Sequence, residues 1–448
     1  MSGFVPHTDS EIAEMLAFMG LSRVEELFAV IPEALRIAGP LGLPLGMGEA
    51  DVVAAMEGLA AHNRVGGELV CFAGGGAYDH DIPAAVKALS SRSEFVTAYT
   101  PYQPEVSQGV LQALFEFQTV VSRLAGLPVA NASLYDGSSS LVEALNLAVA
   151  ATGRQAVWLS EGINPRWREV ARTLAQGTGH DLLDVPLVAG GTQWPVPGST
   201  EPPAALVVAY PNFLGCLEDM AAARDLARSV GALFVVVFDP VAAGLLRSAG
   251  EWDADLAVGE GQSLGNPLGF GGPYLGLFAC AASHVRRMPG RLVGETVDTR
   301  GTRSYVTTLR AREQDIRREK ASSNVCTNQT LMAVTAAIHL AWLGPRGLQE
   351  VALQCARGTR YCRERLLAID GVEPITDLPV LREFAIRTPV SPELLVERLA
   401  DEGYLAGIPL GPDWETSGCR DGLLVAVTEK RTRAEIDGFA DVLAKAVR

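Results

Sequence analysis

An aspartate at the end of an apolar segment is the first residue of this sequence that could do chemistry. Asp239 directly follows residues 232–238, an apolar run that predicts a buried strand, and a second strand-like piece follows at 254–258. In many pyridoxal-phosphate enzymes, an aspartate at one strand end pairs with the pyridine nitrogen of the cofactor. In those enzymes a lysine beyond the next strand forms the Schiff base. Residues 239–276 contain no lysine, so this layout is incomplete here.

The whole chain contains four lysines, and their positions leave little room for a Schiff base elsewhere. Lys87, Lys430 and Lys445 lie in or beside segments with a helical pattern. Lys320 ends a basic segment and is the only lysine that we expect could approach the carboxyl edge of a sheet. The alternative for Lys320 is a charge at a helix C-terminus, where the helix dipole favours a cation. A self-sufficient pyridoxal-phosphate lyase or aminotransferase is therefore disfavoured but stays open.

A polar and aromatic segment, residues 99–105, is the second candidate for chemistry. Its sequence is YTPYQPE, and the residue before each proline is pushed out of the helical region, which predicts an extended backbone. Two phenols, a glutamine and a carboxylate on one extended segment are typical of a binding loop. The alternative is a surface turn that caps the helix predicted at 109–125.

A Gly-Ser-rich turn, residues 131–140, precedes a helix predicted at 141–152. Its sequence, NASLYDGSSS, offers backbone N–H groups and hydroxyls to an anion, typically a phosphate. The alternative is that Ser138 or Ser139 caps the helix. The chain contains no G-x-S-x-G elbow, P-loop or H-E-x-x-H motif, and its six histidines have no metal-ligand spacing. We therefore predict no metal site.

The elements that would position these residues alternate between strand and helix. Such alternation predicts a mostly parallel sheet covered by helices, in which ligands bind beyond the carboxyl ends of the strands. We expect Asp239, Asn212, the 131–140 turn and the GEGQSLG turn at 259–265 to meet at that edge. The predicted strands are 156–160, 182–185, 204–210 and 233–238, and the predicted helices between them are 165–176 and 217–230.

Three regions are predicted along the chain. Residues 1–66 form an N-terminal helical arm, whose first helix starts at the capping box Thr8–Glu11. Residues 67–345 form a large α/β domain, which closes with a helix that Gly344 and Pro345 stop. Residues 346–448 form a small C-terminal α+β domain. Its predicted strands are 382–387 and 422–427, and its predicted helices are 392–402 and 432–445.

Composition limits the class of protein. The chain has 448 residues, of which 48% are hydrophobic and 20% charged, as expected of a soluble globular protein with more than one lobe. The net charge of -15 argues against nucleic acid or an anionic membrane as a partner. The seven cysteines are scattered without a C-x-x-C motif, which indicates reduced thiols. No signal peptide and no apolar run of about 18 residues is evident, so we expect a cytoplasmic protein without a membrane span.

Seven motifs, in order along the chain, resemble a known family. They resemble the first, or alpha, subunit of glycine dehydrogenase (decarboxylating), which is the P-protein of the glycine cleavage system in its two-subunit bacterial form. The resemblance runs from PHTDSEI near the N-terminus to the closing helix, and it implies pyridoxal-phosphate fold type I, the aspartate-aminotransferase-like fold. The motifs are FAGGGAYDHDIPAAV, TAYTPYQPEVSQG, NASLYDGSSS, PNFLGCLED, GEGQSLGNPLGFGGPYLG, GRLVGETVD and LRAREQDIRREKASSNVCTNQ.

The resemblance also implies an activity shared between two subunits. A beta partner holds pyridoxal phosphate on its lysine, glycine loses CO2, and the aminomethyl group passes to the lipoyl arm of H-protein. This is the glycine dehydrogenase (aminomethyl-transferring) reaction of glycine catabolism, and the family implies an alpha-beta pair doubled into a heterotetramer. In the beta subunit a His-Lys pair stands where this chain has Gln262 and Ser263. Asp239 takes the place of the aspartate at the ring nitrogen, so the resemblance implies a vestigial pocket without a cofactor of its own.

On this resemblance, the alpha chain contributes to chemistry through its extended loop. We hypothesise that five residues reach into the cofactor site of the beta subunit. A purely structural or regulatory subunit is the alternative. The arginine-rich residues 286–318 are expected to be a structured excursion, with contact to an acidic H-protein as the alternative. The five residues that we hypothesise reach into the cofactor site of the beta subunit are Tyr99, Thr100, Tyr102, Glu105 and Gln108.

Overall fold

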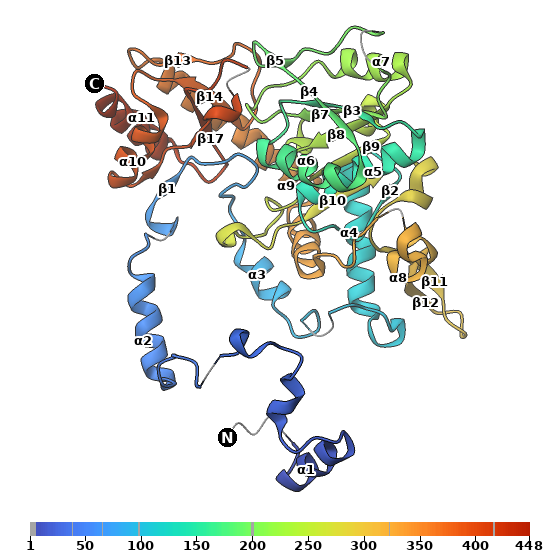
Figure 1. Ribbon diagram of the computed structural model, residues 1–448. Coiled ribbons are helices and arrows are strands. Elements are labelled where there is room, and N and C mark those ends of the chain that lie inside the picture. The colour runs from blue at the N-terminus through green and yellow to red at the C-terminus, as the bar shows by residue number, and fades with distance from the viewer. Residues whose placement is uncertain are drawn as a thin grey trace. The chain divides into compact units, whose positions relative to one another are not determined.

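The computed structural model describes residues 6–37, 39–64, 66–96, 99–198, 201–321, 323–414 and 417–448. The chain divides into two compact units, Met1–Arg64 and Val65–Arg448 (Figure 1). In the first unit, α1 (Asp9–Phe18) begins at the predicted capping box. The Thr8 side chain accepts from the Glu11 N–H, and the Thr8 N–H donates to the Glu11 carboxylate at 2.7 Å. The second helix of this unit is α2 (Glu49–Ala60), and two short 3-10 helices lie between them.

The second unit is built on a seven-stranded sheet with the strand order β2-β10-β9-β8-β7-β3-β4. Strands β4, β3, β7, β8 and β9 are parallel neighbours, while β10 runs antiparallel to β9 and β2. The predicted mostly parallel sheet is thereby confirmed. The strands are β2 (Val129–Ala130), β3 (Ala156–Ser160), β4 (Asp181–Val185), β7 (Ala205–Tyr210), β8 (Leu233–Phe238), β9 (Leu256–Glu260) and β10 (Gly276–Cys280).

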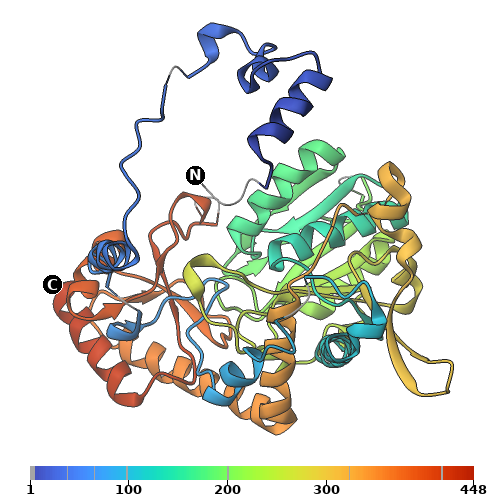
Figure 2. The ribbon, with the colours of Figure 1, turned by 90° about the horizontal axis from the view of Figure 1, so that it is seen from below.

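Helices cover both faces of this sheet, because successive strand residues point to opposite sides (Figure 2). On one face Leu206 and Val236 pack in a core with α4 (Gln108–Ala125), α7 (Met220–Val230) and α9 (Thr330–Leu367). On the other face Val207 and Val235 pack with α5 (Gly137–Thr152) and α6 (Pro165–Thr178). Because β4, β3, β7, β8 and β9 run parallel between these two apolar clusters, their carboxyl ends lie at one edge of the sheet.

Helix α9 is interrupted at its middle, as the sequence predicts. Gly344 has non-helical backbone angles, with φ 61° and ψ 178°, so the range Thr330–Leu367 consists of two helices that meet at a kink. This agrees with the prediction of one helix at 330–343, ended by Gly344 and Pro345, and of another at 347–369. Proline fits the first turn of a helix, where its missing N–H is not needed, so the second half starts immediately after the kink. The two halves of α9 together join the large sheet to the C-terminal region.

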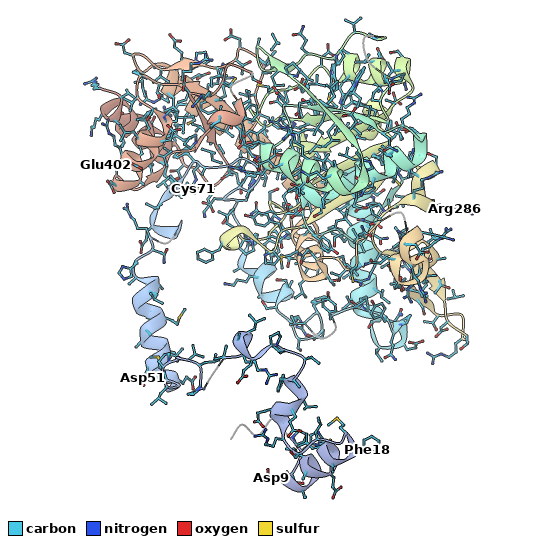
Figure 3. The ribbon with its side chains drawn as sticks, in the orientation of Figure 1. Asp9, Phe18, Asp51, Cys71, Arg286 and Glu402 are labelled. Atoms are coloured by element: carbon cyan, nitrogen blue, oxygen red, sulfur yellow. The ribbon has the colours of Figure 1, made fainter. Side chains whose placement is uncertain are left out.

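The C-terminal region contains a four-stranded antiparallel sheet of order β13-β14-β17-β16 with two helices. The segment that opens the second unit runs onto this region, because Cys71 of β1 pairs with Leu405 of β15. Figure 3 labels Cys71 and Glu402, which lies just before β15. The domain boundaries proposed at 66/67 and 345/346 stay predictions. The elements are β1 (Val70–Cys71), β13 (Glu373–Pro374), β14 (Glu383–Arg387), β15 (Tyr404–Leu405), β16 (Ile408–Pro409), β17 (Gly422–Ala426), α10 (Pro392–Asp401) and α11 (Arg433–Ala446).

The arginine-rich stretch forms a hairpin, β11 (Leu292–Val297) with β12 (Arg303–Thr308), followed by the short α8 (Gln314–Arg317). The prediction of a structured excursion is confirmed. Helix α3 (Ala84–Ser90) and the small hairpin β5 (Leu187–Val188) with β6 (Gly191–Thr192) complete the elements. Within the part of the chain that the structure describes, no helix is long and apolar enough to cross a membrane.

Candidate active site

A cavity of about 90 Å³ lies at the carboxyl ends of β7, β8 and β9. Asn212, Asp239 and Ser263 line it from the side of the sheet, as the strand order predicts. Residues from other elements close it from the opposite side. These are Gly76 and Tyr78 of the segment after β1, together with Arg382 and Glu383 at the start of β14.

Both carboxylate oxygens of Asp239 accept hydrogen bonds from other groups of this chain. Its Oδ1 accepts from the backbone N–H groups of Val241 and Ala242 at 2.8 and 3.1 Å. Its Oδ2 accepts from the Arg382 guanidinium, whose side chain is only 6% exposed. The guanidinium carbon of Arg382 lies 3.4 Å from the centre of the Tyr78 ring, a cation–π contact. The carboxylate that would face a ring nitrogen therefore faces an internal cation.

Glu260, which ends β9, lies against the start of α5. Its Oε2 accepts from the Gly137 N–H at 2.9 Å, and its Oε1 accepts from the N–H groups of Gln262 and Leu275 at 2.9 and 2.8 Å. Burial raises the pKa of Glu260 to about 8, while these backbone hydrogen bonds act in the opposite direction. The predicted anion-binding turn thus holds a carboxylate of the same chain.

The N-cap of α5 is not one of the two serines, Ser138 or Ser139, that were predicted as the alternative to anion binding. Asp136, and neither serine, is the N-cap, because its Oδ1 accepts from the Ser139 N–H at 2.7 Å. The Ser138 hydroxyl donates to the same oxygen at 2.7 Å. The helix starts at Gly137, so both serines fall inside the first turn, where their side chains cannot reach the N–H groups that a cap satisfies.

Gln262 and Ser263 occupy the turn after β9. Gln262 accepts from the Tyr78 N–H at 2.9 Å and donates to the Tyr78 and Asn266 carbonyls at 3.2 and 2.8 Å. The Tyr78 hydroxyl in turn donates to Glu383 at 2.7 Å, and burial raises the pKa of that carboxyl to about 7. Gln262 therefore fixes the segment that covers the cavity, and Ser263, 5% exposed, is part of its wall.

The loop at 99–105 lies away from this cavity. Tyr99 and Tyr102 are 80% and 57% exposed, and Glu105 is exposed as well. Gln108, at the start of α4, holds the base of the loop. Its amide donates to the Tyr305 carbonyl and accepts from the Tyr305 N–H, both at 2.8 Å.

An arginine fixes the middle of the loop. Arg291, a buried residue of the segment before β11, donates to the Thr100 hydroxyl at 3.2 Å. Its guanidinium also lies 5.7 Å from the centre of the Tyr102 ring, and that of Arg310 lies at 5.5 Å. Tyr102, Arg291 and Arg310 line a second pocket of about 290 Å³, which Cys326 also lines. Neither Arg291 nor its role was found from the sequence.

Comparison with known proteins identifies the family. The sequence model of the family described as Glycine cleavage system P-protein matches residues 2–443. The chain belongs to this P-protein family.

Relatives of this P-protein chain match it over nearly its full length. A probable glycine dehydrogenase (decarboxylating) subunit 1 of Moorella thermoacetica is 49% identical, over 97% of this chain and 98% of the relative. The protein with the same description from Nitratidesulfovibrio vulgaris is 47% identical, over 98% and 99%.

Solved structures confirm the predicted fold type I. A crystal structure of glycine decarboxylase (P-protein) of the glycine cleavage system, in inhibitor-bound form, is 44% identical, covers 99% of both chains and has a TM-score of 0.87. The cysteine desulfurase CsdA from Escherichia coli is 16% identical, covers 85% of this chain and 95% of its own, and has a TM-score of 0.60. The second likeness concerns the fold alone.

The pocket of this P-protein chain does not fit pyridoxal phosphate. Among the described residues no lysine lines the cavity, and Lys320 is exposed on a short 3-10 helix after α8. Asp239 and the α5 turn, which would bind the ring nitrogen and the phosphate, are occupied by Arg382 and Glu260. The cavity of about 90 Å³ is also small beside the roughly 300–1,000 Å³ of sites that enclose an organic ligand.

One trio of side chains has the composition of a metal site. His80 Nδ1 lies 2.6 Å and Cys355 Sγ 3.5 Å from Glu429 Oε2. However, the Arg382 Nη1, which can only donate, lies 2.9 Å from His80 Nε2. His80 must therefore carry its proton on Nδ1 and donate it to Glu429, and burial raises the pKa of the Cys355 thiol. Two of the three atoms that would bind a metal, His80 Nδ1 and Cys355 Sγ, therefore carry protons in this arrangement.

Proposed function

We propose that this chain is the alpha subunit of a two-subunit glycine dehydrogenase (decarboxylating). With a beta subunit that holds pyridoxal phosphate on a lysine, it decarboxylates glycine, releases CO2 and transfers the aminomethyl group to the lipoyl arm of H-protein. The full-length match to proteins described as subunit 1 of this enzyme supports the assignment. We place the assembly, an alpha-beta pair doubled into a heterotetramer, in the cytoplasm.

In this proposal the chain's own pocket does no chemistry. The single observation that carries it is the pair of Asp239 and Arg382, which puts an internal cation where the cofactor ring would lie. The chain alone, mixed with pyridoxal phosphate, is therefore expected to give no imine absorbance band. A borohydride-reducible adduct on Lys320 would instead support a self-sufficient pyridoxal-phosphate enzyme.

The contribution to catalysis comes from the loop at 99–105. Its base and middle are fixed by Gln108 and Arg291, while the Tyr99 and Tyr102 side chains extend into solvent. A loop with a rigid base and exposed phenols is suited to inserting side chains into a neighbouring subunit, since little further ordering is required on assembly. We assign Tyr99, Thr100, Tyr102 and Glu105 to the site of the beta subunit, with Gln108 at its edge.

The test is glycine–bicarbonate exchange with lipoylated H-protein, measured for this chain with and without a beta partner. Tyr102→Phe and Glu105→Gln are expected to keep complex formation on size exclusion and to lose exchange by at least about tenfold, since each removes a group that touches the reacting atoms. Glu116→Gln is a matched control, because Glu116 is an exposed carboxylate on α4. Unchanged exchange in both loop variants would reject the loop's role and favour a structural or regulatory subunit.

A further inference from the structure

The cavity beside Asp239 has a carboxyl group and a guanidinium at the two positions where a phosphopyridine would carry charge. The negative position is the N-terminus of α5, and the positive position is the space in front of Asp239. Glu260 occupies the first and Arg382 the second. Both sets of contacts belong to this chain's own pocket, and they are independent of whether the loop at 99–105 reaches a partner.

Glu260 binds the N–H of Gly137, the first residue of α5, and two backbone N–H groups that adjoin β9 and β10. It accepts three backbone hydrogen bonds, from Gly137, Gln262 and Leu275, at 2.8–2.9 Å. A helix N-terminus favours a negative group through its dipole and its free N–H groups, and it binds a carboxylate as readily as a phosphate. The Trp167 ring packs against Gly137, since a Cβ added at Gly137 would lie 2.1 Å from that ring. A phosphate could enter only if the Glu260 side chain left.

Arg382 takes the place of the protonated pyridine ring, the other charged part of the cofactor. It is a flat cation that pairs with Asp239 and lies on the Tyr78 ring. Tyr78 cannot move away easily, because Gln262 binds both its N–H and its carbonyl and Glu383 accepts from its hydroxyl. The guanidinium also donates to His80 Nε2 at 2.9 Å. The ring position is thus filled by a side chain that contacts Asp239, Tyr78 and His80.

We propose that Glu260 and Arg382 replace the phosphate and the ring cation of pyridoxal phosphate in this chain, so that the pocket excludes the cofactor even when a lysine is supplied. The missing lysine is then only one of three barriers to binding. The pocket is a structural element in which Asp239 pairs with Arg382 and the Glu260 carboxyl group is bound by backbone N–H groups of the same chain.

Restoring the lysine tests this proposal directly. The full-length variant Ser263→Lys is mixed with pyridoxal phosphate, reduced with borohydride and mapped by peptide mass spectrometry. We expect no imine band and no adduct at position 263. The triple variant, which adds Glu260→Ala and Arg382→Ala to Ser263→Lys, is expected to show the imine band and the adduct at position 263. An adduct in the single variant as abundant as in the triple variant would overturn the proposal.

A second measurement covers the case in which loss of Arg382 prevents folding. Glu260→Ala alone removes a carboxylate from the pocket and leaves the Asp239–Arg382 pair intact, so this variant is expected to fold. Inorganic phosphate should raise its thermal midpoint by at least about 2 °C and leave the parent chain unchanged. Equal responses of the two chains to phosphate would refute the role of Glu260. The matched control is Glu251→Ala, which removes an exposed carboxylate far from α5 in sequence.

Discussion

Replacement of Arg382 by methionine is expected to destabilise this chain strongly. The guanidinium is 6% exposed and the Asp239 side chain 16%, so the variant leaves a carboxylate with poor access to water. Removing one partner of a buried ion pair costs about 3–5 kcal/mol, because the remaining charge is uncompensated. The two backbone N–H groups that Asp239 retains place the expected loss at about 3 kcal/mol.

A double-mutant cycle in urea separates this effect from lost packing. Asp239→Asn removes the charge that Arg382→Met strands, so the double variant is expected to recover about 1–3 kcal/mol relative to additive losses. The control is Arg360→Met, since Arg360 forms a 3.0 Å pair with Glu364 at the surface and its side chain is 82% exposed. That control is expected to change the free energy of unfolding by less than about 1 kcal/mol. The buried pair would be refuted as a stabilising contact by either of two results. One is that the losses in free energy of unfolding of Asp239→Asn and Arg382→Met simply add in the double variant. The other is that Arg382→Met loses no more free energy of unfolding than Arg360→Met.

Three further perturbations follow from other contacts. Burial raises the pKa of Glu143 to about 7, so the native chain binds this proton more tightly than the unfolded chain. Stability should therefore fall by about 3 kcal/mol as the pH rises from about 4.5 to 7, and urea unfolding of Glu143→Gln should lack this slope. Arg291→Met releases the ring of Tyr102 and is expected to lower kcat of the reconstituted enzyme more than Arg291→Lys does; equal activity of both variants with the parent would contradict this. Gly215→Ala would place a Cβ 1.8 Å from the Glu383 carbonyl at a φ of 80°, so a loss above about 3 kcal/mol in urea is expected, and a loss near 1 kcal/mol would show that β14 can move.

Local patterns in the sequence were sufficient for most elements and for the place of the site. The run at 232–238 is apolar because β8 is buried on both faces. The end of this run therefore predicts that the strand ends just before Asp239. Parallel strands then bring Asn212, Asp239 and the turn after β9 to one edge. The break at Gly344 was predicted correctly. The local error, at the cap of α5, concerns a single backbone position whose alternatives differ by little free energy.

The closing side of the cavity could not be predicted in the same way. Arg382 lies 143 residues from Asp239, and Tyr78 lies 184 residues from Gln262 and 305 from Glu383. No periodicity links such distant positions, and an arginine before a strand is most often a surface residue. Tyr78 and Glu260 do lie in the motifs FAGGGAYDHDIPAAV and GEGQSLGNPLGFGGPYLG, so the motifs marked the right segments without indicating the contacts.

The contacts of Arg382 and Glu260 explain how this chain keeps its fold without a bound cofactor. An aspartate at the end of a buried strand and a free helix N-terminus are both costly when left alone, because each is a charge or partial charge removed from water. In an enzyme that binds pyridoxal phosphate, the cofactor compensates them, and folding is coupled to cofactor binding. Here Arg382 and Glu260 compensate them from within the chain. Under the proposed function, the chain can then present its loop at 99–105 whether or not a cofactor is bound in its own pocket, as a subunit that completes a partner's site requires.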